Sequence, residues 1–308
     1  MTTDFSVNSS GSLHNCSAAE FCAYGLPLRQ DPAASRKILL VGKDSYVGSH
    51  LKQYLGTENY TLDELNARDL VPDASMFRGW DTVVFLAAIV HQKETAENRE
   101  LYYAVNRDLA VKAAEAAKEA GVRHFIIMST MAVYGIETGM ITKATKAAPV
   151  THYGSSKQQA DEIIWAMRDD SFMVTILRPP MVYGKGCHGN YQPLRSFVLT
   201  SPVFPDYENR RSMIFIGNLC AYMKEVIDLG KEGVFFPQDS EYVCTSELVR
   251  RIAAEHNRKI VMTRAFNPLI RMLPISLMKK VFGSLTYEQT EPVSTYSFKE
   301  AVHLTEKQ

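Results

Sequence analysis

The stretch KILLVGKDSYVG at residues 37–48 decides the fold of this 308-residue chain. It opens with a short apolar run, typical of a strand buried in a parallel sheet. A glycine-containing turn follows, and residues 49–55 then show a helical pattern. Further apolar runs alternate with helical segments: the runs at 59–65, 81–88, 124–130 and 172–177, the helices at 101–120 and 153–167. The alternation predicts an α/β fold with a doubly wound parallel sheet.

The turn itself has the spacing Gly42-x-x-Ser45-x-x-Gly48. Gly42 would allow a tight turn, the small Ser45 would let the backbone approach a pyrophosphate, and Gly48 would allow close packing of helix on strand. The helix N-terminus would then face the anion. Because Ser replaces the middle glycine, an ordinary strand–helix turn explains the spacing equally well on its own. Its place in the first β/α unit favours a Rossmann-type dinucleotide site.

An acidic residue about 20 positions after the first glycine is expected to hold the adenosine ribose. Asp63 lies at this spacing from Gly42, and Asp69 with Leu70 follows closely enough to contact adenine. A carboxylate here repels a 2′-phosphate, so the sequence favours NAD over NADP as the cofactor. Lys43 in the turn instead favours NADP, because a basic residue could bind that phosphate.

The chain divides into three parts by composition. We expect residues 1–36 to be a flexible N-terminal extension, 37–183 to be the nucleotide-binding core, and 184–308 to be mainly a smaller C-terminal substrate lobe. The 34 basic and 34 acidic residues balance, which argues against a nucleic-acid partner. No apolar run reaches the length that spans a bilayer, so no stable membrane insertion is expected.

The five cysteines are scattered, which favours reduced thiols and a cytoplasmic location. The histidines lack ligand spacing, so no metal site is expected. Residues 268–283 are apolar but interrupted by Arg271, Lys279 and Lys280. We expect them to pack on the C-terminal lobe or at a dimer interface rather than on a membrane surface.

Tyr153 and Lys157 stand four residues apart at the start of a predicted helix. Residues at this spacing share one helical face, so both side chains can reach one site. A nearby ammonium favours phenolate and would lower the pKa of the tyrosine from its usual value near 10. The pair is then a candidate proton shuttle for an alcohol or sugar hydroxyl. Alone, the spacing is common and weak evidence.

This pair is one of six motifs that follow one another in a fixed order. They are the glycine turn, the small residues Ala87 and Ala88 after a strand, Asn106 within a helix, STMAVYG at 129–135, YGSSK at 153–157 and RPPMVYG at 178–184. Together they resemble the extended short-chain dehydrogenase/reductase superfamily and, within it, the NAD-dependent nucleotide-sugar epimerase/dehydratase family. The resemblance runs from about residue 37 to the C-terminus and is closest to a compact bacterial branch found with surface-polysaccharide genes.

The resemblance implies a role for each matching residue. Tyr153 matches the acid/base, Lys157 the residue that holds the nicotinamide ribose, and Thr130 the hydroxyl that binds the reacting sugar oxygen. Arg211 and, less specifically, Asn190 match residues that bind the substrate diphosphate. The cofactor is then surrounded by Gly42, Ser45, Tyr46, Val47, Gly48, Asp63, Asp69, Leu70, Ala87, Ala88, Asn106, Lys157 and Pro180.

The implied activity is 4-epimerisation of a nucleotide sugar by transient hydride transfer to NAD, in a homodimer formed through the two long helices. The alternative is a reductase of a nucleotide-linked 4-keto-6-deoxy sugar. A dehydratase is less favoured because Met131 follows Thr130 where those enzymes carry an acidic pair. A nucleotide-sensing protein without catalysis is a third class, which the intact Thr130, Tyr153 and Lys157 oppose. The family's usual Asn soon after Arg178 is missing, so the sugar is not specified.

Overall fold

The computed structural model describes residues 35–90, 94–95, 97–272 and 276–307. Nearly all of the N-terminal extension expected at residues 1–36 lies outside the described residues, and so does part of the apolar segment 268–283. In the described chain, no helix combines the length and the apolarity that crossing a membrane requires.

The centre of the molecule is a parallel sheet of six strands, which confirms the predicted fold class. The strand order is β10-β6-β4-β3-β1-β2. Their bounds are β1 Arg36–Val41, β2 Tyr60–Leu65, β3 Thr82–Phe85, β4 His124–Met128, β6 Met173–Leu177 and β10 Gly233–Phe235. The chain passes from β1 to β2 on one side and then returns to place β3 on the other side. The switch in direction therefore lies beside the carboxyl end of β1.

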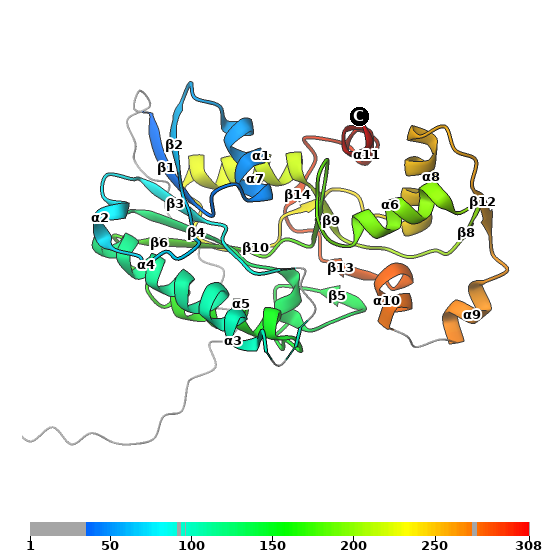
Figure 1. Cartoon of the computed structure of the whole chain (residues 1–308), viewed down its shortest axis with the longest axis horizontal. Helices are drawn as coiled ribbons and strands as arrows, with labels where there is room; N and C mark the ends of the chain where they lie inside the picture. Colours follow the sequence, from blue (N-terminus) through cyan, green and yellow to red (C-terminus); the bar gives the residue numbers. More distant parts are fainter. Residues whose placement is uncertain (1–34, 91–93, 96, 273–275, 308) are drawn as a thin grey trace, which may run out of the picture.

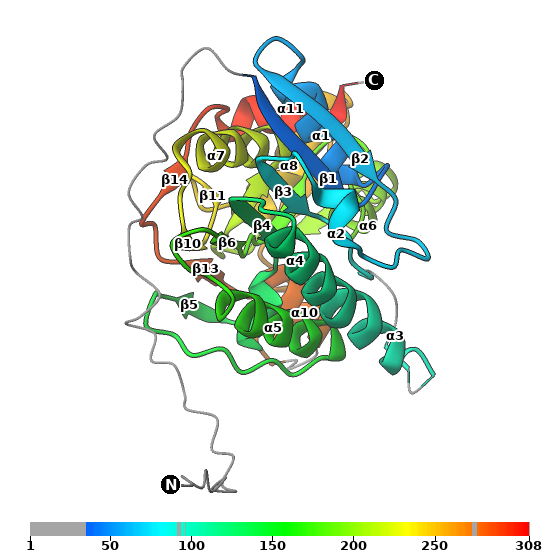
Figure 2. The same cartoon turned by 90° about the vertical axis from the view of Figure 1, so that its left-hand side faces the viewer.

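Helices cover both faces of this sheet (Figures 1 and 2). On one face lie α1 (Tyr46–Leu55) and α7 (Ile216–Leu229), and on the other lie α4 (Ala110–Glu119) and α5 (His152–Trp165). Successive strand residues pack on opposite faces of the sheet. Ile38 and Leu40 belong to the core under α1 and α7, and Leu39 and Val41 belong to the core under α4 and α5. Strands buried on both faces explain the continuous apolar runs in the sequence.

The long helix expected at 101–120 is continuous but not uniform. It consists of α3 (Arg99–Tyr103), a π-helical segment η2 (Ala104–Leu109) and α4. Near the end of β4 lies a short 3-10 helix, η3 (Met131–Tyr134), and α2 (Ala74–Phe77) precedes β3.

The C-terminal lobe is built from helices and short strand pairs. Its helices are α6 (Tyr191–Thr200), α8 (Thr245–Glu255), α9 (Asn267–Met272), α10 (Ser276–Phe282) and α11 (Phe298–Glu306). The parallel pairs are β7 (Met181–Tyr183) with β9 (Met213–Phe215), β8 (Val203–Pro205) with β12 (Val261–Thr263), β5 (Gly139–Ile141) with β13 (Leu285–Tyr287), and β11 (Gln238–Asp239) with β14 (Pro292–Val293).

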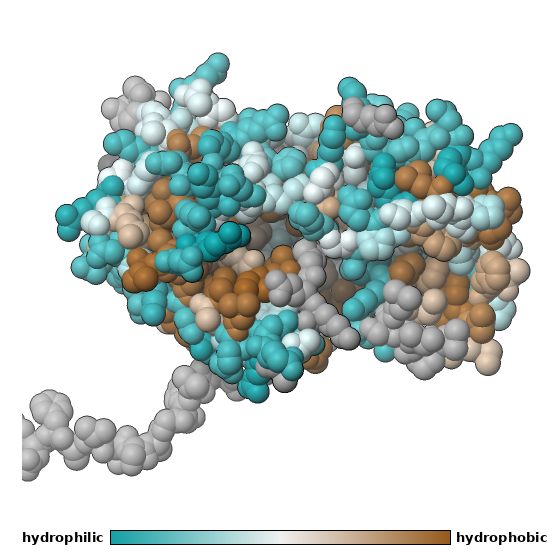
Figure 3. Space-filling model, viewed as in Figure 1, coloured by the Kyte–Doolittle hydropathy of each residue, from teal (hydrophilic) through white to brown (hydrophobic). Residues whose placement is uncertain are grey.

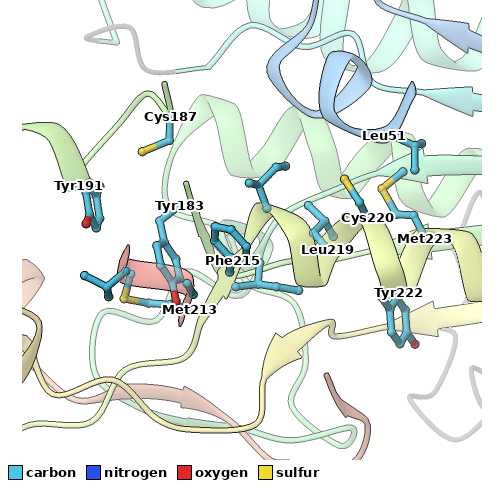
Figure 4. Close-up of a cluster of buried hydrophobic side chains, with 14 of the residues drawn as sticks. Leu51, Tyr183, Cys187, Tyr191, Met213, Phe215, Leu219, Cys220, Tyr222 and Met223 are labelled. Carbon is cyan, nitrogen blue, oxygen red and sulfur yellow. The ribbon is translucent and has the colours of Figure 1, made fainter. Parts of the chain in front are cut away.

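The two halves of the chain share one core. Both α7 and β10 come from beyond residue 183, yet they complete the central sheet and its covering layer. Figure 4 shows apolar side chains running from Leu51 of α1 past Leu219 to Tyr183 and Tyr191. The guanidinium of Arg36 also donates to the main-chain carbonyls of Ile227 and Asp228 at the end of α7. The sheet and the lobe therefore share a continuous hydrophobic core.

Candidate active site

The turn between β1 and α1 lies at the carboxyl edge of the sheet. Gly42 has a φ of 125°, and a Cβ there would lie 3.0 Å from the amide nitrogen of Ala87. The Gly42 amide donates to the carbonyl of Leu65 at 2.9 Å, and the Ala87 amide donates to the carbonyl of Val41 at 3.0 Å. The turn is thus fixed between the ends of β2 and β3, where doubly wound sheets bind their ligands.

Ser45 caps α1. Its Oγ accepts a hydrogen bond from the Gly48 amide at 3.2 Å, and a Cβ on Gly48 would lie 2.6 Å from that oxygen. The amides of Tyr46 and Val47 lie in the first helical turn, so they have no acceptor within the helix. Such free amides can bind a phosphate. The Tyr46 ring lies 4.5 Å from the His50 ring, and its hydroxyl lies 2.7 Å from the Cβ position of Gly184.

Asp63 lies within β2 rather than at its end. It is exposed and pairs with Leu39, while Leu65 is the residue that pairs with Val41 beside the turn. Asp69 is exposed at a φ of 58°, and Leu70 packs against the core layer that contains α4. Two strand positions therefore separate Asp63 from the turn, and the binding of adenosine by these three residues stays a prediction.

Asn106 fixes the loop that begins with Ala87 and Ala88. It is fully buried in η2. Its Oδ1 accepts from the Ile89 amide at 2.7 Å, and its Nδ2 donates to the Ile89 carbonyl at 3.1 Å and to the Ser156 Oγ at 3.2 Å. These bonds tie the end of β3 to α5. The π-helical turn, a feature often found at functional sites, carries this residue.

Thr130 and Tyr153 meet where η3 touches the first turn of α5. The Thr130 Oγ1 accepts from the Ala132 amide at 3.1 Å, and a side-chain hydrogen bond joins Thr130 to Tyr153. Gly154 permits this approach, because a Cβ there would lie only 2.7 Å from the Ala132 carbonyl oxygen. A glycine in a helical first turn thus explains why two predicted site residues come together.

Two acceptors fix the N-terminus of α5. The Thr151 Oγ1 accepts from the Gly154 amide at 3.0 Å, and the Glu94 carboxylate accepts from the amides of His152 and Tyr153, both at 2.9 Å. A carboxylate at a helix N-terminus is favourable. Nothing in the sequence pattern singles out Glu94, because it lies in a loop far from Tyr153 along the chain.

Lys157 is enclosed one helical turn beyond Tyr153. Its side chain is 1% exposed, and its Nζ has no hydrogen-bond partner within the described chain. Burial lowers the pKa of Lys157 to about 8, and the nearby Asp161 carboxylate opposes this shift. A buried amine without an acceptor fits a ligand that brings hydroxyl groups, such as the ribose of NAD. The residues present therefore fit this cofactor.

A buried ionic network supports this part of α5. The Asp161 Oδ2 accepts from the Ser129 Oγ at 2.7 Å and from the Arg178 Nε at 3.0 Å, and the Arg178 Nη1 donates to the Tyr134 hydroxyl at 3.0 Å. Both Asp161 and Arg178 are buried. Sequence reasoning did not select Asp161, although its place four residues after Lys157 on the same helical face was a usable signal.

The pKa of Tyr153 differs from the sequence-based expectation. Burial raises it to about 12, while the hydrogen bond with Thr130 lowers it and the Asp161 charge raises it further. The prediction that Lys157 lowers the tyrosine pKa is therefore wrong for this structure. The physical reason is that removal of water disfavours both the phenolate and the ammonium, so each group is held toward its neutral form.

The remaining predicted residues lie farther along the chain. Pro180 is buried after β6, where the Pro179 carbonyl accepts from the Met131 amide at 3.0 Å and brings this segment against η3. Asn190 is exposed at the start of α6. Arg211 donates to the carbonyl of Gly283 at 2.9 Å, and burial lowers its pKa. Asn190 and Arg211 thus belong to the C-terminal lobe, and their binding of a diphosphate stays a prediction.

The C-terminal lobe also contains a cavity of about 690 Å³. Its wall carries four arginines, Arg210, Arg250, Arg264 and Arg271, together with Asp206. Asp206 pairs with Arg250 at 2.6 Å and with Arg264 at 3.5 Å. None of Thr130, Tyr153 and Lys157 lines this cavity.

Comparison with known proteins agrees with this geometry. The chain is 32% identical over 251 residues to a UDP-glucose 4-epimerase of Vibrio cholerae, covering 72% of this chain and 76% of the relative. In fold it is similar to a UDP-glucuronic acid 4-epimerase of Bacillus cereus solved with NAD (TM-score 0.69, 16% identity, 88% and 97% covered). It is equally similar to a dTDP-4-dehydrorhamnose reductase of Clostridium acetobutylicum (TM-score 0.70, 18% identity, 87% and 98% covered). Residues 38–233 match a family described as NAD dependent epimerase/dehydratase. The chain is therefore a member of the NAD-dependent epimerase/dehydratase family.

Proposed function

We propose that this protein is a nucleotide-sugar 4-epimerase that interconverts a UDP-hexose, or its N-acetyl form, in the synthesis of surface-polysaccharide precursors. The observation that carries the proposal is the meeting of Thr130 with Tyr153 beside the enclosed Lys157. The similarity to the UDP-glucose 4-epimerase of Vibrio cholerae supports the substrate class.

Each group has a distinct part in the reaction. Tyr153 takes the proton of the sugar 4-hydroxyl and later returns it to the same oxygen. Thr130 orients that oxygen through its hydroxyl, and the Lys157 amine holds the ribose hydroxyls of the cofactor. The turn at Gly42 and the first amides of α1 hold the pyrophosphate. When bound, NAD supplies the hydride acceptor and a positive charge that favours the phenolate form of Tyr153.

Burial links the protonation of Tyr153 to the charge around it. Because burial raises the pKa of Tyr153 to about 12, the phenol keeps its proton near neutral pH unless positive charge is close to it. The chemistry is then coupled to occupation of the cofactor site. Asn106 holds the loop after β3 by accepting from the Ile89 amide, and Glu94 holds the start of α5 by accepting from the Tyr153 amide.

The proposal is tested by incubating the full-length, NAD-loaded protein with UDP-glucose, UDP-galactose and their N-acetyl forms without added reductant. Interconversion of one pair is expected. The Tyr153→Phe variant should lose about 10²- to 10⁴-fold in turnover. Tyr54→Phe, on the partly exposed surface of α1, is the matched control and should keep full activity. No turnover of any UDP-hexose by the loaded wild-type protein would rule the proposal out.

A reductase of a nucleotide-linked 4-keto sugar is the second candidate, since the same three residues serve that chemistry. The fold likeness to the dTDP-4-dehydrorhamnose reductase is as high as that to the epimerase. The exposed Lys43 in the turn is compatible with the 2′-phosphate of NADP. Consumption of one NAD(P)H for each keto sugar reduced, with no epimerisation of UDP-hexoses, would select this function.

We also propose that the protein acts as a homodimer through the helical layer that contains α3 and α5. Leu101 and Ile163 are apolar residues exposed on these helices, at 46% and 43%. Light scattering should give twice the mass of one chain, and the double variant Leu101→Glu/Ile163→Glu should give a monomer. A wild-type monomer at micromolar concentration would contradict this assembly.

A further inference from the structure

The strongest feature outside the active site is the charge of one continuous segment. Residues 256–287 contain six Lys or Arg residues and no Asp or Glu, in a chain whose 34 basic and 34 acidic residues otherwise cancel. The segment comprises β12, α9 and α10. Within the structure, Arg264 pairs with Asp206 and Lys279 with Glu137, both at 3.5 Å, and the other basic residues add positive charge to this part of the lobe.

The same segment exposes large apolar side chains. Val261, Phe266, Leu269 and Met272 are exposed by 62%, 45%, 56% and 79%, all within twelve residues. Figure 3 shows apolar side chains gathered at the lower right, where α9 and α10 lie in Figure 1. Apolar patches of this kind, bordered by polar residues, mark an interaction surface.

The exposed residues are not needed to pack α9 on the protein. Ile270 fills that role by packing against the core, and the Asn267 side chain donates to the Asp206 carbonyl at 3.0 Å. Leu269 and Met272 lie three residues apart on one face of α9, and Asn267 and Ile270 lie on the other face. The helix therefore has an inner anchored side and an outer apolar side.

Basic residues surround this outer side. Arg264 is 83% exposed just before α9, Arg271 lies within α9, and Lys280 is exposed on α10. Arg264 and Arg271 also line the 690 Å³ cavity, which opens beside the segment. Exposed apolar side chains flanked by Arg and Lys, with room for phosphate groups between the arginines, match the chemistry of a membrane interface with anionic headgroups.

In place of the sequence-based expectation that residues 268–283 pack only against protein, we propose that the face formed by β12, α9 and α10 docks the protein onto an anionic phospholipid surface. Leu269 and Met272 insert at the boundary between the headgroups and the acyl chains, and Arg264, Arg271 and Lys280 pair with lipid phosphates. The contact is peripheral, since the outer side of α9 offers only about two turns of helix. It holds the protein at the membrane surface without inserting the chain.

The test uses the full-length protein and sedimentation with two vesicle types, phosphatidylcholine alone and phosphatidylcholine with phosphatidylglycerol. Binding is expected to the second type only and to fall as salt is raised. The variant Arg264→Gln/Arg271→Gln/Lys280→Gln should weaken partitioning by roughly fivefold per charge. Leu269→Ser/Met272→Ser should weaken it at all salt concentrations.

Matched control variants lie at the opposite end of the molecule, near α2 (Figure 1). Val71→Ser/Met76→Ser removes two exposed apolar side chains, and Lys37→Gln/Arg78→Gln/Lys112→Gln removes three exposed charges. Both controls should bind vesicles like the wild type, and thermal unfolding should show all variants folded.

Three results would overturn the proposal. The first is that the wild-type protein does not sediment with anionic vesicles at low salt. The second is an equal loss of binding in the face variants and the controls. The third is a change of oligomeric state in Leu269→Ser/Met272→Ser, seen by light scattering without lipid, which would assign the face to a second copy of the chain. None of these results depends on which sugar the enzyme turns over.

Discussion

Asp161 of α5 and Arg178 form a buried ion pair, with the Arg178 Nε 3.0 Å from the Asp161 Oδ2. The two side chains are 1% and 9% exposed. The pair links α5, one turn after Lys157, to the segment that follows β6. It therefore sets the position of the helix face that carries Tyr153 and Lys157.

Asp161→Asn should destabilise the protein strongly, because it leaves the Arg178 guanidinium buried without its carboxylate. The expected loss is about 3–5 kcal/mol in the free energy of unfolding, measured with urea. Glu225→Gln, which breaks the exposed pair with Lys231 at 2.7 Å, is the control and should cost less than about 1 kcal/mol. If Asp161→Asn costs no more than the control, the pair does not organise this region.

Lys157→Met should make the cofactor-free protein more stable while removing its activity. The pKa of Lys157 is about 8 in the folded protein and near 10.4 in the unfolded chain. Below pH 8 the lysine is charged in both states, and burying that charge lowers the stability of the folded protein. The wild type should be less stable than the variant by up to about 3 kcal/mol at pH 7.

The difference in unfolding free energy between the wild type and Lys157→Met should depend on pH in a defined direction. The unfolded lysine binds a proton that the folded one has lost between pH 8 and about 10.4, so wild-type stability rises relative to the variant over that range. Thermal unfolding of both proteins at several pH values measures it. A gap that stays constant with pH would show that Lys157 is not held toward its neutral form.

Gly42→Ala should impair both stability and dinucleotide binding. The residue combines a φ of 125° with a Cβ position 3.0 Å from the Ala87 nitrogen, so a methyl group strains the turn and pushes on the end of β3. A loss of about 2–3 kcal/mol is expected. Gly56→Ala separates the two effects, since Gly56 also has a positive φ of 66° but nothing within 4 Å of its Cβ position.

The control should lose about 1 kcal/mol and keep full affinity for NAD. Calorimetric titration of NAD into the two purified variants makes the comparison. Equal affinities would mean that the turn at Gly42 does not form the pyrophosphate site.

Asn106→Ala should loosen the loop after β3. The substitution leaves the Ile89 amide and carbonyl without their buried partners, which costs about 3 kcal/mol in unfolding free energy. NAD should bind more weakly, because the loop borders the switch point of the sheet. Asn59→Ala on the exposed surface should stay within about 0.5 kcal/mol of the wild type. Unchanged NAD affinity in Asn106→Ala would limit Asn106 to a role in stability.

Most of the central sheet was predictable because its signal is local. Each strand is an apolar run followed by a turn, so β1, β2, β3, β4 and β6 could be placed from residues that are adjacent in sequence. Thr130 and Tyr153 both lie in the connection between β4 and β6, and the order of the motifs that resemble the family is what placed them in one site.

Other parts of the site depend on pairing between distant residues. A count of residues after Gly42 selects Asp63, but strand register decides which residue lies beside the turn, and that residue is Leu65. Burial of Asp161, Arg178 and Lys157 is likewise invisible in composition, because charged residues are usually exposed. The raised pKa of Tyr153 follows from that burial and could not be obtained from the Tyr–Lys spacing.

The origin of β10 in the second half of the chain bears on protein synthesis. Until residue 235 has left the ribosome, β6 has an unpaired edge, and the sheet face that α7 covers is open to water. A nascent or truncated chain that ends between residues 184 and 235 therefore holds every residue of the glycine turn and of the Tyr153–Lys157 pair without a closed sheet to support them. We expect such a chain to be degraded by added protease faster than the full-length protein, because its apolar sheet face is exposed.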